Sequence, residues 1–131
     1  MRFSVITVTR NSEAVLARAM ASLQEQTFAD FEWIVVDGAS QDGTVAVARR
    51  FAAAPLQLVS ESDSGIYDAM NKGVRLARGE YLYFLNSDDT LADPAVLERA
   101  NEAIEATRQP ELLIGRPRGR TAAARSPTRV P

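Results

Sequence analysis

The chain has 131 residues, 46% of them hydrophobic, which suits one globular domain with a core of its own. It contains no Cys and no His, so disulfides, thiol catalysis, imidazole bases and His-ligated zinc are excluded within this chain. The net charge of −2 hides an asymmetry, because residues 1–114 carry 10 basic and 17 acidic side chains whereas residues 115–131 carry five Arg and no acid.

The predicted elements alternate between strand and helix along residues 1–114. Apolar runs of strand length occupy 3–8, 31–36, 56–59, 80–85 and 112–114. Helical periodicity follows Asn11-Ser12 as far as Leu23, and recurs over 43–53, 66–77 and 94–107. Ser40 or Asp42 is expected to cap the second helix, and Gly79 is expected to close the third, whose apolar face begins at Ile66. The pattern predicts an α/β fold with a mostly parallel sheet covered by helices on both faces.

The basic segment 115–131 differs in kind from the rest of the chain. It is rich in Arg and Pro and shows no sustained apolar periodicity, so we expect it to be disordered and solvated. No nucleic-acid partner is expected, and peripheral contact with a membrane is the alternative to a solvated tail. There is no apolar run of transmembrane length and no signal-peptide pattern after Met1, so the expected location is cytoplasmic, with the inner face of the membrane as a contact site.

Two predicted strands end in carboxylates. Asp37 follows the run 33–36, and Asn86-Ser87-Asp88-Asp89 follows the run 81–85. Ligands of open α/β sheets bind outside the carboxyl ends of the strands, so both acidic ends are expected to face one crevice. Carboxylates there suit Mg²⁺ or Mn²⁺, which often share their ligands with substrate phosphates. A pair of acids by itself is more often a simple turn.

Roles can be assigned to these acids from their positions. Asp37 suits a hydrogen bond from a base or ribose, and the alternative is a turn residue that accepts from the amides of Ala39 and Ser40. Vicinal strand-end side chains point to opposite faces, so we assign the metal to Asp89 and a ribose or sugar hydroxyl to Asp88. The turn after the first strand lacks Gly, which argues against P-loop enzymes, dinucleotide dehydrogenases and sugar nucleotidyltransferases.

A polar loop over 61–65 leads into the third predicted helix. Asp68, Asn71, Lys72 and Arg75 recur three or four residues apart, on the face opposite the apolar one. This density of polar groups indicates a surface that faces a ligand. The alternative is an ordinary solvated helix face.

Four segments, in this order, resemble family 2 glycosyltransferases of the GT-A fold. They are Ser4–Asn11, Val36–Thr44, Gly65–Gly73 and Ala77–Asp89, and they look most like the bacterial branch that builds capsular, exopolysaccharide or lipopolysaccharide glycans. The resemblance covers roughly residues 3–114, which we take as the nucleotide-sugar-binding GT-A portion (1–114).

The resemblance implies an inverting transfer from a nucleotide-diphospho-sugar donor to a glycan or lipid-linked acceptor, with Mn²⁺ or Mg²⁺. It places Thr9, Asn11 and Asp37 at the nucleoside, makes Asp88-Asp89 the DXD-type metal motif, and puts Asp68, Asn71 and Lys72 in a donor-binding segment. Family members continue well past the metal motif and supply a general base there. The fold is thus expected to be incomplete at the C-terminus and the chain inactive in transfer, and a non-catalytic nucleotide-sugar-binding module is the alternative.

Burial gives a further expectation. Leu91, Val96, Leu97 and Leu112 would normally pack against later parts of such a chain, so we expect them to be partly uncovered. An exposed apolar patch of this kind favours self-association.

Overall fold

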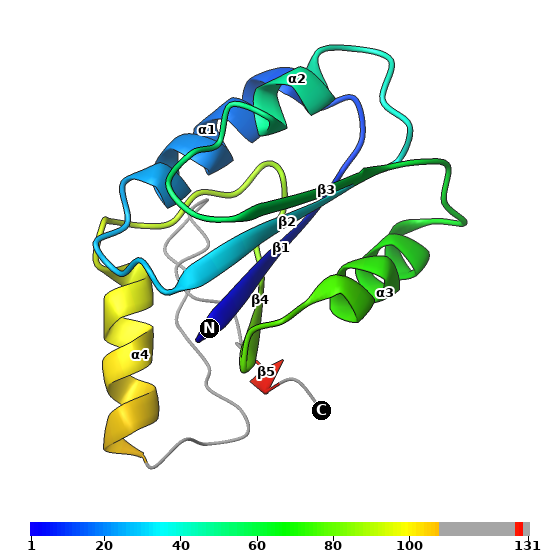
Figure 1. Cartoon of the computed structure of the whole chain (residues 1–131). Helices are drawn as coiled ribbons and strands as arrows, with labels where there is room; N and C mark the ends of the chain where they lie inside the picture. Colours follow the sequence, from blue (N-terminus) through cyan, green and yellow to red (C-terminus); the bar gives the residue numbers. More distant parts are fainter. Residues whose placement is uncertain (108–127, 130–131) are drawn as a thin grey trace.

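The computed structural model describes residues 1–107 and the backbone of residues 128–129. Its centre is a sheet in the order β3-β2-β1-β4-β5, in which four strands run parallel and β5 is antiparallel to β4 (Figure 1). The strands are β1 (Phe3–Thr9), β2 (Phe31–Asp37), β3 (Leu56–Ser60), β4 (Tyr81–Phe84) and β5 (Thr128–Arg129). The predicted mostly parallel sheet is confirmed. The predicted strand 112–114 and nearly all of the segment 115–131 lie outside the described residues.

Helices cover both faces of this sheet, as the alternating pattern predicts. They are α1 (Glu13–Gln24), α2 (Thr44–Ala48), α3 (Ile66–Leu76) and α4 (Val96–Ala106). The helices α1, α2 and α4 share one apolar core with the sheet, and α3 packs on the opposite face (Figure 1). Among the described residues, no helix combines the length and the apolar character needed to cross a membrane.

The central strands are buried on both sides. Every residue of β2 is buried, as expected for a parallel strand between two helical layers. Trp33 lies in the larger core, where its indole Nε1 donates a hydrogen bond to Thr7 Oγ1 (2.9 Å) and its ring meets Phe51 edge-on with centroids 5.0 Å apart. The buried indole therefore has both its apolar and its polar requirements satisfied.

The second helix is shorter than predicted. It was expected over 43–53, but α2 ends at Ala48 and the chain then tightens into turns, with Arg50 N donating to Val47 O and Phe51 N to Ala48 O. This tightening brings Phe51 into the core against Trp33. Packing of one aromatic ring thus overrides the helical periodicity. Neither Ser40 nor Asp42 is the N-cap of α2, so that prediction is wrong. The N-cap is Gly43, and Asp42 precedes it, with its Oδ1 accepting a hydrogen bond from Thr44 N (3.0 Å).

Gly79 does not close α3, so that prediction is wrong. The residue that ends the helix is Ala77, whose backbone is extended. Gly79 is instead buried at a point where a Cβ would lie 2.6 Å from the backbone of Phe3 and Ser4. It permits close approach of the loop to β1, which is a packing role rather than a conformational one.

Two expectations about burial are also wrong. Ile66 was placed on the apolar face of α3, but it lies in the first turn beyond the sheet and is 56% exposed, while Ala69 and Gly73 make up the buried face. Leu91, Val96 and Leu97 were expected to be uncovered, yet all three are buried because α4 folds back onto the core of α1. Leu112 lies outside the described residues. The three described leucine and valine side chains therefore form no exposed patch, and self-association stays a prediction.

Candidate functional site

The strand order has a switch point at β1. The chain proceeds from β1 to β2 and β3 on one side, whereas β4 lies on the other side of β1 (Figure 1). In open α/β sheets, ligands bind at such a point, outside the carboxyl ends of the strands. The register places Thr9 beside Asp37 and Asp37 beside Ser60 at this edge, and Asn86–Asp89 follows the carboxyl end of β4. The structure therefore brings the predicted residues Thr9, Asp37 and Asp88-Asp89 to one edge of the sheet.

Asp37 is a buried carboxylate held by hydroxyl and amide groups. Its Oδ2 accepts hydrogen bonds from Ser40 N (2.9 Å) and Ser60 Oγ (2.7 Å), and its Oδ1 accepts one from Ser40 Oγ. The turn interaction with the Ser40 amide is thus confirmed. The carboxylate also links the ends of β2 and β3, so its position is fixed before any ligand arrives.

The β1–α1 and β2–α2 loops are joined by hydrogen bonds. Asn11 Oδ1 accepts from Gln41 N (2.8 Å), and Asn11 N donates to Ser40 Oγ (2.7 Å). A turn further on, Ser12 N donates to Thr44 Oγ1 (2.9 Å). The amide oxygen of the Asn11 side chain therefore helps to hold the two loops together, and the contact of Asn11 with nucleotide stays a prediction.

Asp42 adds to this junction as a charged group. The Thr44 hydroxyl donates to it, which is the largest influence on its pKa, and further bonds come from the Thr44 and Glu13 amides. Burial acts in the opposite direction, but the net effect is a lowered pKa for the Asp42 carboxyl. The contacts at this junction therefore favour the ionised form of Asp42.

Backbone strain is concentrated in the same two loops. Asn11 has φ 45° and Ala39 has φ 58°, and they are the non-Gly residues with positive φ in the described chain. Asn tolerates this region, whereas Ala pays a steric cost because its Cβ crowds the backbone. Strain of this kind persists where surrounding contacts enforce it, and it clusters at functional sites.

Thr9 presents an unsatisfied polar atom at the switch point. Thr9 is buried, and its Oγ1 has no hydrogen-bond partner among the described residues. Buried polar atoms nearly always find a partner, so each exception calls for an explanation. A ligand group at this edge of the sheet would supply one.

The β3–α3 loop is fastened to its own helix. Lys72 Nζ lies 3.1 Å from Glu61 Oε1 and 3.6 Å from Asp68 Oδ2, and it donates to Ser62 O (3.2 Å). Asp68 Oδ2 also accepts from Ser64 N (3.0 Å). Asp68 and Lys72 were predicted to bind the donor, and the structure shows them ordering this loop. Asn71 is exposed on the same helix.

These contacts lower the pKa of Asp68 and raise the pKa of Lys72, and both shifts favour the ion pair. The Ser64 amide is the largest cause of the lowered pKa of Asp68, with Lys72 adding to it. The hydrogen bond to Glu61 is the largest cause of the raised pKa of Lys72. Both groups therefore keep their charges at neutral pH.

Two further residues at this edge were not assigned to the site from the sequence. A Cβ at Gly38 would lie 3.0 Å from Asp63 Oδ2 and 3.6 Å from Arg10 Cδ, so an acid and a base flank the turn after β2. A signal was available for Arg10, because it is a basic residue in the turn after the first strand. Asp63 comes from a loop whose path sequence periodicity does not predict.

Asp88 and Asp89 lie in a turn directly after β4. Asp89 N donates to Asn86 O (3.0 Å), and Asp88 is exposed while Asp89 is partly buried. Within residues 1–107, no three acidic side chains gather closely enough to form a complete metal cage. Two carboxylates fit a cation that takes its remaining ligands from phosphate and water, as Mg²⁺ commonly does.

Comparison with known proteins identifies the family. The chain matches the model of glycosyl transferase family 2 over residues 4–119. It is 40% identical over 116 residues to a PGL/p-HBAD biosynthesis glycosyltransferase of Mycobacterium tuberculosis, a match that covers 86% of this chain and 45% of that protein.

Solved structures agree. Residues 1–349 of Staphylococcus aureus TarS in complex with UDP-GlcNAc have a TM-score of 0.85 at 29% identity, over 91% of this chain and 35% of that one. The mannosyltransferase PcManGT from Pyrobaculum calidifontis, in complex with GDP-Man and Mn²⁺, has a TM-score of 0.79 at 29% identity, over 89% of this chain and 36% of that one. The chain thus spans less than half the length of these relatives. The family match and the shared architecture together show that this chain belongs to glycosyl transferase family 2 and has the GT-A fold.

Proposed function

We propose that the described residues form the donor-binding part of an inverting glycosyltransferase that uses a nucleotide-diphospho-sugar. One observation carries the proposal: Thr9 at the end of β1 lies in register with Asp37 of β2 on one side, and Asp88-Asp89 follow β4 on the other side of β1. A ligand that crosses this edge would meet hydrogen-bonding groups at one end and paired carboxylates at the other. A nucleoside diphosphate fits this arrangement, because its base and ribose can form hydrogen bonds at one end and its phosphates can share a cation with the carboxylates at the other.

The nucleoside end is assigned to Thr9, Asn11 and Asp37. The unsatisfied Thr9 hydroxyl and the fixed Asp37 carboxylate would contact base or ribose, while Asn11 shapes the loop around them. Asp68 and Lys72 order the β3–α3 loop, and they contact the donor together with Asn71 in this proposal. Preorganised groups are effective because little reorganisation is needed when the ligand binds.

The diphosphate end is assigned to Asp88 and Asp89. In this proposal Asp89 holds Mn²⁺ or Mg²⁺ and Asp88 accepts a ribose or sugar hydroxyl. A bound divalent cation neutralises the charge that develops on the diphosphate leaving group. Without a cation, the two carboxylates would repel the phosphates, so the same residues predict metal-dependent binding.

No described residue is proposed as the general base. Asp63, Asp68 and Asp93 are the acids of the described chain to consider first, and each accepts a hydrogen bond from a nearby backbone amide, that of Gly65, Ser64 and Ala95 respectively. Asp93 also pairs with the Arg99 guanidinium. These contacts favour structural roles for all three.

The acceptor is proposed from the relatives. The mycobacterial relative is named for PGL/p-HBAD biosynthesis, and a relative from Myxococcus xanthus is named for O-antigen biosynthesis. These names support a glycan or lipid-linked acceptor in the synthesis of a cell-surface polysaccharide. A location at the cytoplasmic face of the membrane belongs to the same proposal, as does contact with that surface.

Calorimetric titration of UDP and GDP tests the donor site. Binding of one of them is expected to strengthen when Mn²⁺ replaces a chelator. Asp89→Ala should remove this dependence more completely than Asp88→Ala, and Arg49→Ala on the exposed end of α2 serves as the matched surface control. Equal affinity with Mn²⁺ and with chelator would refute the metal assignment. Release of nucleoside diphosphate from the donor would favour an active enzyme, and binding without release would favour the non-catalytic module.

A further inference from the structure

The segment that carries Asp88-Asp89 is anchored at both ends. At its start, Leu85 N donates to Ile6 O (2.9 Å), which ties the segment to β1 at the switch point. At its end, Leu91 is buried and its amide donates to Ser22 Oγ on α1 (3.1 Å). The two acids therefore lie on a short span between the sheet and α1.

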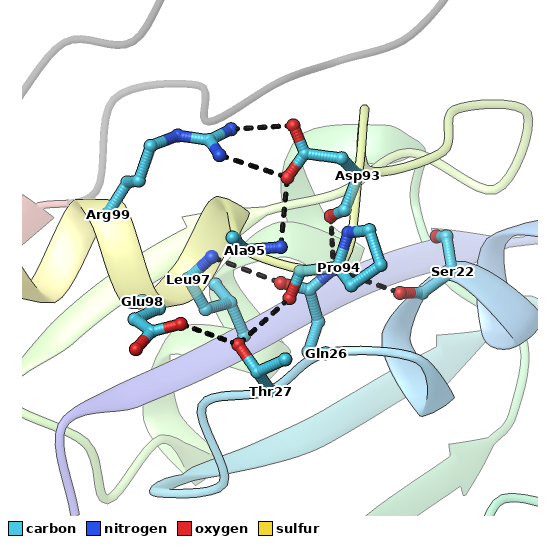
Figure 2. Close-up of polar contacts among 9 residues, drawn as sticks. All are labelled: Ser22, Gln26, Thr27, Asp93, Pro94, Ala95, Leu97, Glu98 and Arg99. Carbon is cyan, nitrogen blue, oxygen red and sulfur yellow. Dashed lines mark hydrogen bonds and ion pairs between the residues drawn. The ribbon is translucent and has the colours of Figure 1, made fainter.

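The end of α1 continues this anchoring through Gln26, as Figure 2 shows. Gln26 Nε2 donates to Asp93 O (2.8 Å) and to Ser22 O (3.1 Å), while Gln26 Oε1 accepts from Leu97 N (3.1 Å) at the start of α4. One side-chain amide thus links α1, the acid-bearing segment and α4. Ser22 Oγ also donates to Ala19 O (2.7 Å), which fixes the orientation of its hydroxyl.

We propose that Ser22 and Gln26 are positioning residues that hold Asp88-Asp89 in the geometry needed for cation and diphosphate. The inference rests on the proposed function, because it takes these acids as the cation ligands. Neither Ser22 nor Gln26 contacts the ligand in this proposal. They act through Leu91 and Asp93, which follow the acids along the chain.

The reason is the cost of ordering a short acidic turn. Two adjacent carboxylates repel one another, and the backbone on either side of them is held by the bonds from Leu85 N to Ile6 O and from Leu91 N to Ser22 Oγ. A site that is ordered before binding loses less conformational freedom when the cation binds. Residues that hold metal ligands in place tune the affinity for the metal for the same reason, and their mutation typically lowers that affinity or the activity by about 10- to 100-fold.

The same junction contains a contact that serves as a control. Thr27 Oγ1 donates to Glu98 Oε2 (2.7 Å) and to Pro94 O (3.2 Å), so this hydroxyl ties α1 to the start of α4 rather than to Leu91 (Figure 2). The backbone bond from Thr27 N to Pro94 O (2.9 Å) does not depend on the side chain. Thr27→Val and Ser22→Ala each delete one hydroxyl from the junction, but only the latter frees the Leu91 amide.

The test is the ratio of UDP or GDP affinity with Mn²⁺ to affinity with chelator, measured by calorimetry on the full chain. Thermal melts first establish a temperature at which every variant is folded. In Ser22→Ala this ratio is expected to fall by about 10-fold, the lower end of the range for residues behind metal ligands, with metal-free affinity unchanged. Ser22→Thr, which keeps the hydroxyl, and Thr27→Val should retain the ratio of the unsubstituted chain.

Gln26→Glu supplies a second route if Ser22→Ala does not fold. It keeps an acceptor for Leu97 N but loses the donor to Asp93 O, so it should lower the same ratio. An unsubstituted chain that binds nucleotide equally with and without Mn²⁺ would overturn the proposed function together with this inference. If the unsubstituted chain does bind nucleotide more tightly with Mn²⁺, two results would overturn the positioning role alone. One is that Ser22→Ala or Gln26→Glu keeps the full ratio, and the other is that the ratio falls equally in Thr27→Val.

Discussion

Strand β2 carries two buried carboxylates, one near each end, and they have different surroundings. Near the amino end, Glu32 accepts hydrogen bonds from Ser4 Oγ (2.6 Å), Gln57 Nε2 (2.8 Å) and Arg78 N (2.8 Å), and it pairs with the Arg78 guanidinium (3.2 Å). At the carboxyl end, Asp37 accepts from serine hydroxyls and one amide. Glu32 has a cation beside it, whereas Asp37 is held by neutral donors.

Under the proposed function, one strand separates stability at its amino end from recognition at its carboxyl end. The bonds to Glu32 join β1, β2 and β3 to the segment that leads into β4, so they close the sheet at its amino edge. Burial is the largest single influence on the pKa of Glu32 and raises it, but the hydrogen bonds together outweigh burial and the pKa is lowered. Asp37 instead borders two strained loops, where a ligand can compete for its lone pairs.

The largest expected effect is on stability at the amino edge. Glu32→Ala removes the acceptor for the Ser4 hydroxyl and the Arg78 amide, and unsatisfied buried donors should lower the free energy of unfolding by about 3 kcal/mol. Urea denaturation measures this. Glu32→Gln keeps an acceptor and should lose less, and nucleotide affinity of the folded variant should not change. A loss of affinity in Glu32→Ala would break the proposed separation.

The next effect belongs to the opposite end of the strand. Asp37→Asn should weaken nucleoside diphosphate binding by about 1.5–3 kcal/mol, since a hydrogen bond to a charged group is lost, and should leave the metal dependence unaltered. Stability should fall less, because Asn keeps one acceptor oxygen for the Ser40 amide. Unchanged affinity in calorimetry would return Asp37 to a purely structural role.

Acid titration tests the contribution of Glu32 to stability. The folded pKa of Glu32 lies below its ordinary value of 4.5, so its contribution to stability is present above that value and is lost as pH falls through the folded pKa. The stability gap between the unsubstituted chain and Glu32→Gln should therefore narrow below about pH 4.5. Urea midpoints across acidic pH measure the gap, and a gap that widened on acidification would contradict the lowered pKa.

The smallest effect concerns strain beside Asp37. Ala39→Gly removes the steric cost of a positive φ at that residue, although Gly also adds freedom to the unfolded chain. We expect the free energy of unfolding to rise by up to about 1 kcal/mol, because the steric term is the larger. A clear loss of stability would show that the methyl group packs usefully in the loop.

The sequence predicts the sheet well because its signals are local. Apolar runs and the alternation of periods identify the parallel strands and the helices that flank them, and strand-end chemistry then predicts Asp37 and Asp88-Asp89 as site residues. Long-range packing explains the errors. Phe51 shortens α2 by turning toward Trp33, and Gly79 meets the backbone of a strand far away in sequence.

The candidate site was less predictable than the fold. The family resemblance assigns Asn11, Asp68 and Lys72 to donor binding, which stays a prediction. The structure adds that they fasten loops, a role that depends on partners such as Gln41 and Glu61. Gln26 gave no signal at all, because its role follows from the place where α4 starts. Contacts between segments that are distant in the sequence produce no periodic pattern from which they could be predicted.

The buried indole gives the protein a built-in spectroscopic reporter. Trp33 is the chain's single tryptophan, and it lies on β2 between Glu32 and Asp37 with its nitrogen bonded to Thr7. Its fluorescence should be that of a dry, rigid environment while the chain is folded and should shift to the red when the core opens to water. Every denaturation curve proposed above can thus be read without a label, from one fluorophore in the core.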